Sequence, residues 1–94
     1  MERDELECFL ILAEELHFGR TAVRMRLSRA RVSQLVQRLE RRLGAPLFER
    51  TSRNVRLTEL GAGFREEVEP HHRAIERALA RTAAASVGPS ASAS

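Results

Sequence analysis

The chain has 94 residues, of which 16 are arginines, none is lysine and 13 are acidic, so its formal net charge is +3. This length allows one compact domain with a short appendage and excludes a multidomain enzyme. The single cysteine, Cys8, excludes an intramolecular disulfide, and the absence of a secretory leader or of an apolar bilayer-spanning run predicts a cytoplasmic protein without a membrane partner.

The positive charge is concentrated in the middle of the sequence. Residues 20–56 contain 11 arginines and two glutamates, whereas residues 1–19 contain one arginine and six acidic residues. An arginine-rich segment favours binding to a polyanion, because each phosphate that an arginine neutralises releases condensed counterions. A layer of anionic lipid headgroups and simple solvation of the arginines are the alternatives at this stage.

The N-terminal segment is predicted to form a helix over residues 4–16. Asp4 followed by Glu7 has the spacing of a helix N-cap with a reciprocal capping carboxylate, and apolar residues then recur at helical intervals. The acidic side chains of this helix are expected on its outer, solvated face: Glu5, Glu7, Glu14 and Glu15.

Two further helices follow. A short one is predicted over residues 19–26, and Leu27-Ser28 reads as a tight turn that ends in an N-cap. The next helix continues to a C-terminal stop at Gly44. Two helices with this spacing, the second long and rich in arginine, are typical of a helix-turn-helix whose second helix enters the major groove of DNA. The same pattern also fits an ordinary helical hairpin with a charged outer face.

Residues 47–50 and 55–57 read as two short strands around a polar turn. Because so small a hairpin is marginal alone, its apolar side chains must lean on the helices. Three arginines would then be free to meet a phosphate backbone: Arg50, Arg53 and Arg56.

Thr58 is a suitable N-cap for a final helix, which is predicted to reach about residue 84 with a kink or a break at Pro70. Its apolar residues form one stripe: Leu60, Phe64, Val68, Ile75 and Leu79. The stripe is too long for so small a core to cover, which favours a partner helix, although packing against the first helix of the same chain is the alternative. Residues 86–94 are rich in alanine and serine, and we expect them to be disordered.

No residue pattern predicts catalysis, a cofactor or a metal. His71 and His72 are adjacent, so on a helix they point about 100° apart and do not form the usual same-face metal pair. The serines and histidines show no nucleophile arrangement, and no glycine-rich phosphate loop is found. We therefore expect no enzyme and no catalytic, cofactor-binding or metal-binding residue.

Residues 4–84 closely resemble the N-terminal domain of LysR-type transcription regulators. The most specific part of the resemblance is the ordered set L-E, L-G-x-P-L-F-E-R, R and L-T-E at fixed separations. The matching segments are Phe18-Gly19-Arg20-Thr21-Ala22, Leu27-Ser28, Val32-Ser33-Gln34, Leu39-Glu40, Leu43-Gly44, Pro46-Leu47-Phe48-Glu49-Arg50, Arg53 and Leu57-Thr58-Glu59.

The resemblance implies a mainly α, winged helix-turn-helix fold with a three-helix core, a two-stranded β wing and a long C-terminal linker helix. Residues 1–57 would form the DNA-binding domain, residues 58–85 the linker or dimerisation helix, and residues 86–94 the tail. Two copies would pair through the linker helix as a homodimer, each placing its third helix in the major groove of double-stranded DNA. Complete regulators continue into a ligand-sensing domain, whereas this chain would be either a stand-alone DNA-binding module or a piece of a longer regulator, so no small-molecule effector site is expected in these residues.

The expected function is therefore sequence-specific DNA binding by a dimeric bacterial transcription regulator. The alternative is an interaction module that pairs through its linker helix with a full-length regulator and modulates it. The candidate base contacts lie at the start of the third helix: Arg29, Arg31, Ser33 and Gln34. The candidate contacts to the DNA backbone or minor groove are Ser28, Arg38, Arg50, Arg53 and Arg56.

Two further expectations concern arginines of the same helix. Arg41 and Arg42 are expected to be solvated or paired with glutamate. Relatives more often carry glutamine, proline or serine, and alanine where this chain has Arg29-Ala30-Arg31. The DNA sequence that this protein reads therefore cannot be carried over from the family.

Overall fold

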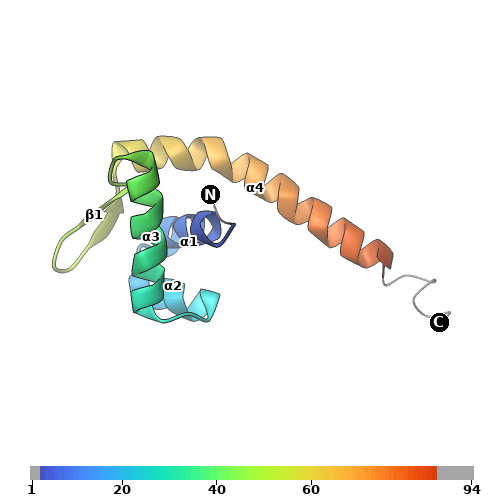
Figure 1. Ribbon diagram of the computed structural model, residues 1–94, viewed down its shortest axis with the longest axis horizontal. Helices are drawn as coiled ribbons and strands as arrows, with labels where there is room; N and C mark the ends of the chain where they lie inside the picture. Colours follow the sequence, from blue (N-terminus) through green and yellow to red (C-terminus); the bar gives the residue numbers. More distant parts are fainter. Residues whose placement is uncertain (1–2, 87–94) are drawn as a thin grey trace.

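The computed structural model describes residues 3–86, which form four helices and one antiparallel two-stranded sheet (Figure 1). The elements in chain order are α1 (Arg3–Glu15), α2 (Phe18–Met25), α3 (Arg29–Leu43), β1 (Phe48–Arg50), β2 (Val55–Leu57) and α4 (Glu59–Ser86). This is the predicted winged helix-turn-helix, with helix boundaries within one or two residues of those expected. We call residues 3–57 the head and the β1–β2 hairpin the wing.

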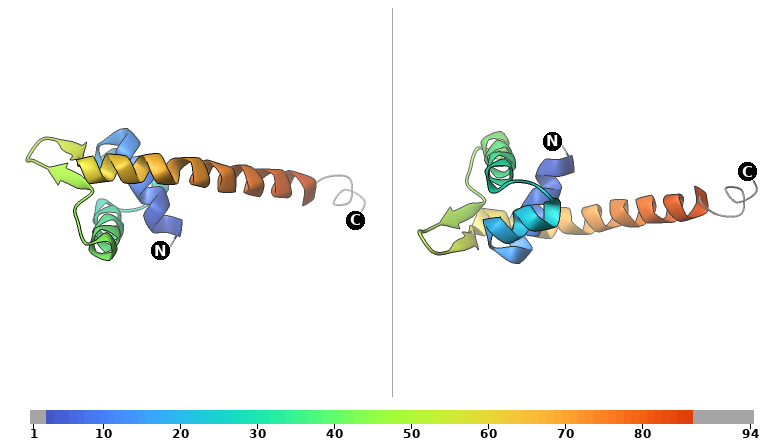
Figure 2. Two further views of the ribbon diagram at one scale, coloured as in Figure 1. Left: turned by 90° about the horizontal axis from the view of Figure 1, so that it is seen from above. Right: turned by 90° about the horizontal axis from the view of Figure 1, so that it is seen from below.

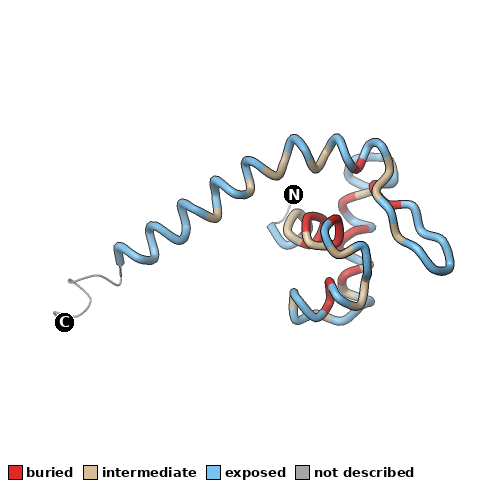
Figure 3. The backbone as a smooth tube through the Cα atoms, turned by 180° about the vertical axis from the view of Figure 1, so that it is seen from behind, coloured by how far each residue is buried: buried red, intermediate tan, exposed pale blue. Residues whose placement is uncertain are grey.

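The core lies in the head, between α1, α2, α3 and the base of the wing. Phe9 of α1 has no exposed surface, and its ring centroid lies 5.6 Å from that of Phe48 in β1 and 5.2 Å from that of Phe64 in α4. One side chain therefore joins α1, the wing and the linker helix. Figure 3 shows the buried residues gathered in the head, whereas every residue of α4 from 77 to 86 is exposed.

Local signals set the helix ends. His17, Ser28 and Thr58 cap the starts of α2, α3 and α4, each accepting a hydrogen bond from the backbone N–H three residues later. Gly44 ends α3 in the left-handed conformation at φ 78°, which glycine adopts without strain. The predicted caps at Ser28 and Thr58 and the predicted stop at Gly44 are confirmed.

Two predictions for α1 are wrong. The helix includes Arg3, so Asp4 lies within it and is not the N-cap. Glu5 is not on a solvated face: it is 1% exposed, with Oε2 3.7 Å from the guanidinium of Arg42 near the end of α3. Within residues 3–86 its other oxygen has no hydrogen-bond partner. Glu5 lies three, four and seven positions before the buried Cys8, Phe9 and Leu12, so the helical period itself places it on the buried face of α1.

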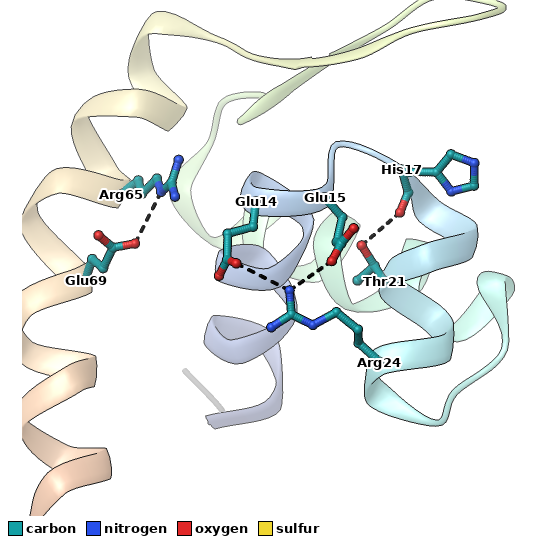
Figure 4. A network of polar contacts seen from close by, with 7 residues as sticks. All are labelled: Glu14, Glu15, His17, Thr21, Arg24, Arg65 and Glu69. Atoms are coloured by element: carbon teal, nitrogen blue, oxygen red, sulfur yellow. Dashed lines mark hydrogen bonds and ion pairs between the residues drawn. The ribbon is translucent and has the colours of Figure 1, made fainter.

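Ion pairs join the other end of α1 to α2. Figure 4 shows Arg24 reaching from α2 to Glu14 and Glu15, at 3.4 and 3.0 Å. The hydrogen bond to Glu15 is the main cause of a raised pKa for Arg24. An ion pair this exposed contributes little to the free energy of unfolding. Its main effect is that the Arg24 guanidinium is already paired with carboxylates.

Helix α4 runs through Pro70 without a break, so of the two predicted alternatives, a kink or a break, the structure excludes the break. The axis of α4 changes direction partway along its length (Figure 1). Pro70 lies inside this helix, and a proline there bends a helix because it has no backbone N–H to donate. Ser86, expected in the tail, is the last helical residue, and the rest of the predicted tail lies outside the described residues. Among residues 3–86, no helix combines the length and the apolar character needed to cross a membrane.

The start of α4 is fitted closely to the base of the wing. Thr58 donates its backbone N–H to the carbonyl of Leu47 and its hydroxyl to the carbonyl of Pro46, each at 2.9 Å. A Cβ added at Gly61 would overlap the same Leu47 carbonyl oxygen, whereas a Cβ at Gly63 would meet nothing within 4 Å. Only glycine at position 61 allows this approach of helix to strand.

Gly61→Ala and Gly63→Ala are therefore expected to change stability in opposite directions. Gly61→Ala should destabilise the protein by about 3 kcal/mol, because backbone must move to admit the methyl group. Gly63→Ala should stabilise it by about 1 kcal/mol through the better helix propensity of alanine. Urea unfolding followed by circular dichroism measures both. Equal changes of the same sign would show that the contact with Leu47 is not restrictive.

Cys8 is expected to be almost unreactive in the folded protein. It is fully buried, its Sγ lies 3.7 Å from the carbonyl oxygen of Val32, and burial raises the pKa of its thiol to about 12. At pH 8 the thiolate fraction then falls from about a quarter for an ordinary thiol to about one in ten thousand. The rate of labelling by an aromatic disulfide should equal that of a free thiol only in denaturant. Rapid labelling without denaturant would contradict the burial.

Candidate nucleic-acid interface

Helix α3 presents one face to the core and the opposite face to solvent. The buried face consists of Val32, Leu35, Val36 and Leu39. Because successive residues turn by about 100°, the residues opposite this face are Ala30, Gln34, Gln37 and Arg41, and all four are exposed. In Figures 1 and 2, α3 and the wing lie at the same end of the molecule, away from the free end of α4.

The four predicted base contacts lie on the first two turns of α3, but only Gln34 belongs to the outward face. Arg29 and Gln34 are exposed, whereas Arg31 and Ser33 are half-buried on the flanks of the helix. Ser28 caps the N-terminus of this helix by accepting the backbone N–H of Arg31, and a helix N-terminus favours a negative charge nearby. Arg38, one of the residues predicted to contact the DNA backbone, is exposed and also lies on this helix, one turn after Gln34.

Gln37 belongs to the outward face but is not among the residues predicted to contact bases. Gln37 lies one turn after Gln34, and its Nε2 donates to the Oγ of Ser33 at 3.4 Å. The helical period carries the signal, because position 37 follows position 34 on the same side. Arg41 also belongs to this face, whereas Arg42 pairs with Glu5, one of the two alternatives predicted for it.

The three wing arginines are not equally free, contrary to the prediction. Arg56 lies directly across the hairpin from Glu49, with Nη2 to Oε2 at 3.2 Å. Arg50 lies 3.5 Å from Glu40 and over the ring of Phe18. Only Arg53, in the exposed turn of the wing, has no ion-pair partner among residues 3–86.

The apolar stripe of α4 divides into two parts. Phe64 and Val68 are half-buried against the core of the head. Leu60, Ile75 and Leu79 remain 51, 53 and 45% exposed. Packing against the chain's own core, the alternative considered above, therefore accounts for the middle of the stripe and not for its ends.

An apolar hollow of about 690 Å³ lies where the end of α3 meets the start of α4. Its lining includes Leu43, Leu60, Gly63 and Phe64, with Glu59 and Glu67 at its polar edge. Leu43 is 41% exposed, so the hollow offers uncovered apolar surface next to that of Leu60.

One ion pair joins α4 to the head, and further pairs lie within α4. Arg3 of α1 pairs with Glu76 at 2.9 Å, and this hydrogen bond raises the pKa of Arg3. His72 Nε2 lies 3.5 Å from the same carboxylate. Along α4, Glu69 pairs with Arg65, as Figure 4 shows, and also with Arg73. The Arg3–Glu76 pair lies beyond Val68, where apolar packing on the head ends.

Comparison with known proteins identifies the domain. Residues 3–62 match the sequence profile of the family described as "Bacterial regulatory helix-turn-helix protein, lysR family". The chain is 45% identical over 85 residues to the HTH-type transcriptional regulator ShiR of Corynebacterium glutamicum (strain R), an alignment that covers 88% of this chain and 28% of ShiR. The chain therefore spans little more than a quarter of the length of this relative.

Two solved structures have the same fold and contain DNA. The BenM DNA-binding domain on its catB site 1 DNA superposes with a TM-score of 0.83 at 28% identity, covering 94% of this chain and 98% of that one. The CbnR DNA-binding domain on DNA superposes with a TM-score of 0.79 at 31% identity, covering 92% of this chain and 99% of that one. The matched family and its members are transcription regulators and not enzymes.

Proposed function

Because the chain belongs to the LysR family of bacterial helix-turn-helix regulators, we propose that it binds specific sites in double-stranded DNA as a homodimer and thereby controls transcription. The observation that carries the proposal is the outward face of α3, which is exposed and flanked by arginines. The N-terminus of this helix is capped by Ser28. Related domains with this fold have been solved on DNA. A DNA-binding protein of this kind would act in the bacterial cytoplasm, associated with the nucleoid when bound.

The first turns of α3 would read the base edges of the major groove. Arg29 and Arg31 suit guanine, because a guanidinium donates to its O6 and N7 together. Gln34 suits adenine, whose N6 and N7 pair with a carboxamide, and Ser33 can donate or accept. Gln37 extends the same face by one turn and is a fifth candidate reader.

Other residues would hold the domain in register on the sugar-phosphate backbone. Ser28 presents the N-terminus of α3 to a phosphate, and Arg38 flanks the groove. In the wing, Arg53 has an exposed guanidinium with no ion-pair partner among residues 3–86, and Arg56 is exposed apart from its contact with Glu49. These two arginines are proposed to contact the backbone or the minor groove.

The ends of the apolar stripe would form the dimer interface together with the residues between them. In an antiparallel pair of α4 helices, Ile75 and Leu79 of one copy can approach the hollow beside Leu43 and Leu60 of the other. A two-fold axis repeats this contact, so a single pairing covers both exposed ends on both copies. Phe64 and Val68, half-buried in the head, would contribute the edges that remain accessible.

Selection of bound sequences from random DNA tests the proposal. We expect enrichment of a two-fold symmetric site, because two copies related by a two-fold axis read two inverted half-sites. A plot of log affinity against log salt should have a slope of about −5 to −9, as for six to ten neutralised phosphates. Absence of enrichment together with a flat salt response would reject the proposal.

The heterodimer alternative predicts a different result. A module that acts by pairing with a full-length regulator would select no DNA by itself and would form mixed dimers when the two proteins are combined. Nothing in the comparisons favours this alternative.

A further inference from the structure

A single carboxylate ties the wing to α3. Glu40 lies in the last turns of α3, and its Oε2 accepts the backbone N–H groups of Leu47 at 2.8 Å and of Phe48 at 3.3 Å. Its other oxygen, Oε1, lies 3.5 Å from Nη2 of Arg50, at the end of the same strand. Both ends of β1 are therefore held by one side chain of the recognition helix.

Arg50 extends this connection to α2. Its Cζ lies 5.0 Å from the ring centroid of Phe18, the first residue of α2, which is a cation–π distance. The Arg50 side chain is 35% exposed, compared with 75% for Arg56 on the neighbouring strand. Arg50 thus contacts all three elements of the DNA-binding surface: α2, α3 and the wing.

The negative charge of Glu40 stabilises the Arg50 side chain in its observed position. The Glu40 side chain is 16% exposed and, in the proposed complex, would face a DNA backbone of like charge. If Arg50 left to pair with a phosphate, this largely buried carboxylate would lose its only cationic partner among residues 3–86. Arg53 has no ion-pair partner among residues 3–86, so it can move to a phosphate without leaving a carboxylate unpaired.

We propose that Arg50 is a positioning residue, which fixes the angle of the wing to the recognition helix through Glu40 and Phe18, and that it does not contact DNA phosphate. Arg53 then supplies the phosphate contact at the turn of the wing. The proposal rests on the DNA-binding function proposed above. It replaces the role that the sequence suggested for Arg50.

The salt dependence of DNA binding distinguishes the two arginines. Arg53→Gln should reduce the slope of log affinity against log salt by about 0.9 for each phosphate that is no longer neutralised, or about 1.8 for a dimer. Arg50→Gln should leave the slope unchanged and lower affinity by about tenfold at every salt concentration. A slope reduced in Arg50→Gln to the same extent as in Arg53→Gln would overturn the proposal.

Arg50→Lys supplies the matched variant. Lysine keeps a positive charge for a phosphate but lacks the planar fork that stacks on Phe18 and faces Glu40. A positioning role predicts that Arg50→Lys loses affinity as Arg50→Gln does, whereas a phosphate contact predicts affinity close to that of the unmodified protein. If the unmodified protein selects no DNA site, the proposed function fails, and the next experiment still tests the positioning role.

Amide hydrogen exchange in the DNA-free protein provides that experiment. Exchange at Leu47 and Phe48, which donate to Glu40, should accelerate at least tenfold in Arg50→Lys and Glu40→Gln and should not change in Arg53→Gln. Circular dichroism confirms that each variant keeps its helices. Unchanged exchange in Arg50→Lys would show that Arg50 does not hold the wing and would overturn the proposal.

Discussion

Replacing both Ile75 and Leu79 with glutamate is expected to make the protein monomeric and to weaken its binding to DNA at least a hundredfold. Both side chains are about half exposed on α4, beyond the part of the helix that packs on the head. Two charges placed in an apolar helix pairing would have to be buried without partners. A monomer also loses the gain of about 10² to 10⁴ that comes from linking two half-site contacts.

Light scattering after size exclusion gives the oligomeric state, and a mobility shift gives the affinity. The matched control is the pair Ala80→Glu and Ala84→Glu, which has the same spacing on the same exposed helix but faces away from the stripe. The control should remain dimeric. Dimers in the first variant and monomers in the control would place the interface on the opposite face of α4.

Replacing Phe9 with alanine is expected to destabilise the protein by about 3 to 5 kcal/mol. Phe9 is fully buried and contacts the rings of Phe48 and Phe64, so the cavity would lie between α1, the wing and α4. Small domains have a total stability of about 5 to 15 kcal/mol, so this loss removes much of the folded population. Urea unfolding at fixed protein concentration measures the effect.

Phe9→Leu is the milder companion variant, because it keeps most of the volume and should cost less than about 1.5 kcal/mol. Leu16→Ala serves as a surface control, since Leu16 is 41% exposed after the end of α1. A change below about 1 kcal/mol for Phe9→Ala would mean that α1, the wing and α4 are held together by other contacts.

The elements that the sequence predicted correctly depend on short-range signals. The caps at Ser28 and Thr58 and the stop at Gly44 each involve hydrogen bonds to residues three or four positions away. These features follow from the sequence whether or not the tertiary packing is known.

The features that the sequence did not predict depend on distant partners. The charge of Glu5 predicts a solvated position, but the side chain lies against Arg42, which is 37 positions later in the sequence. The sequence predicts a free Arg50, but Glu40 and Phe18 engage it. The apolar residues of α4 recur at helical spacing, so the sequence does not separate those that are covered from those that are exposed. How far the head extends along α4 decides which of them are covered.

The close fit of Thr58 and Gly61 against residues 46 and 47 has a geometric consequence. With 28 residues, α4 is a lever of about 42 Å. A tilt of about 5° at this joint displaces its far end by about 3.7 Å, which is close to the rise of about 3.4 Å for one base pair. In the proposed homodimer, the angle of this joint would set the separation between the two α3 helices. A small side chain added there would then change the operator length that the dimer could span.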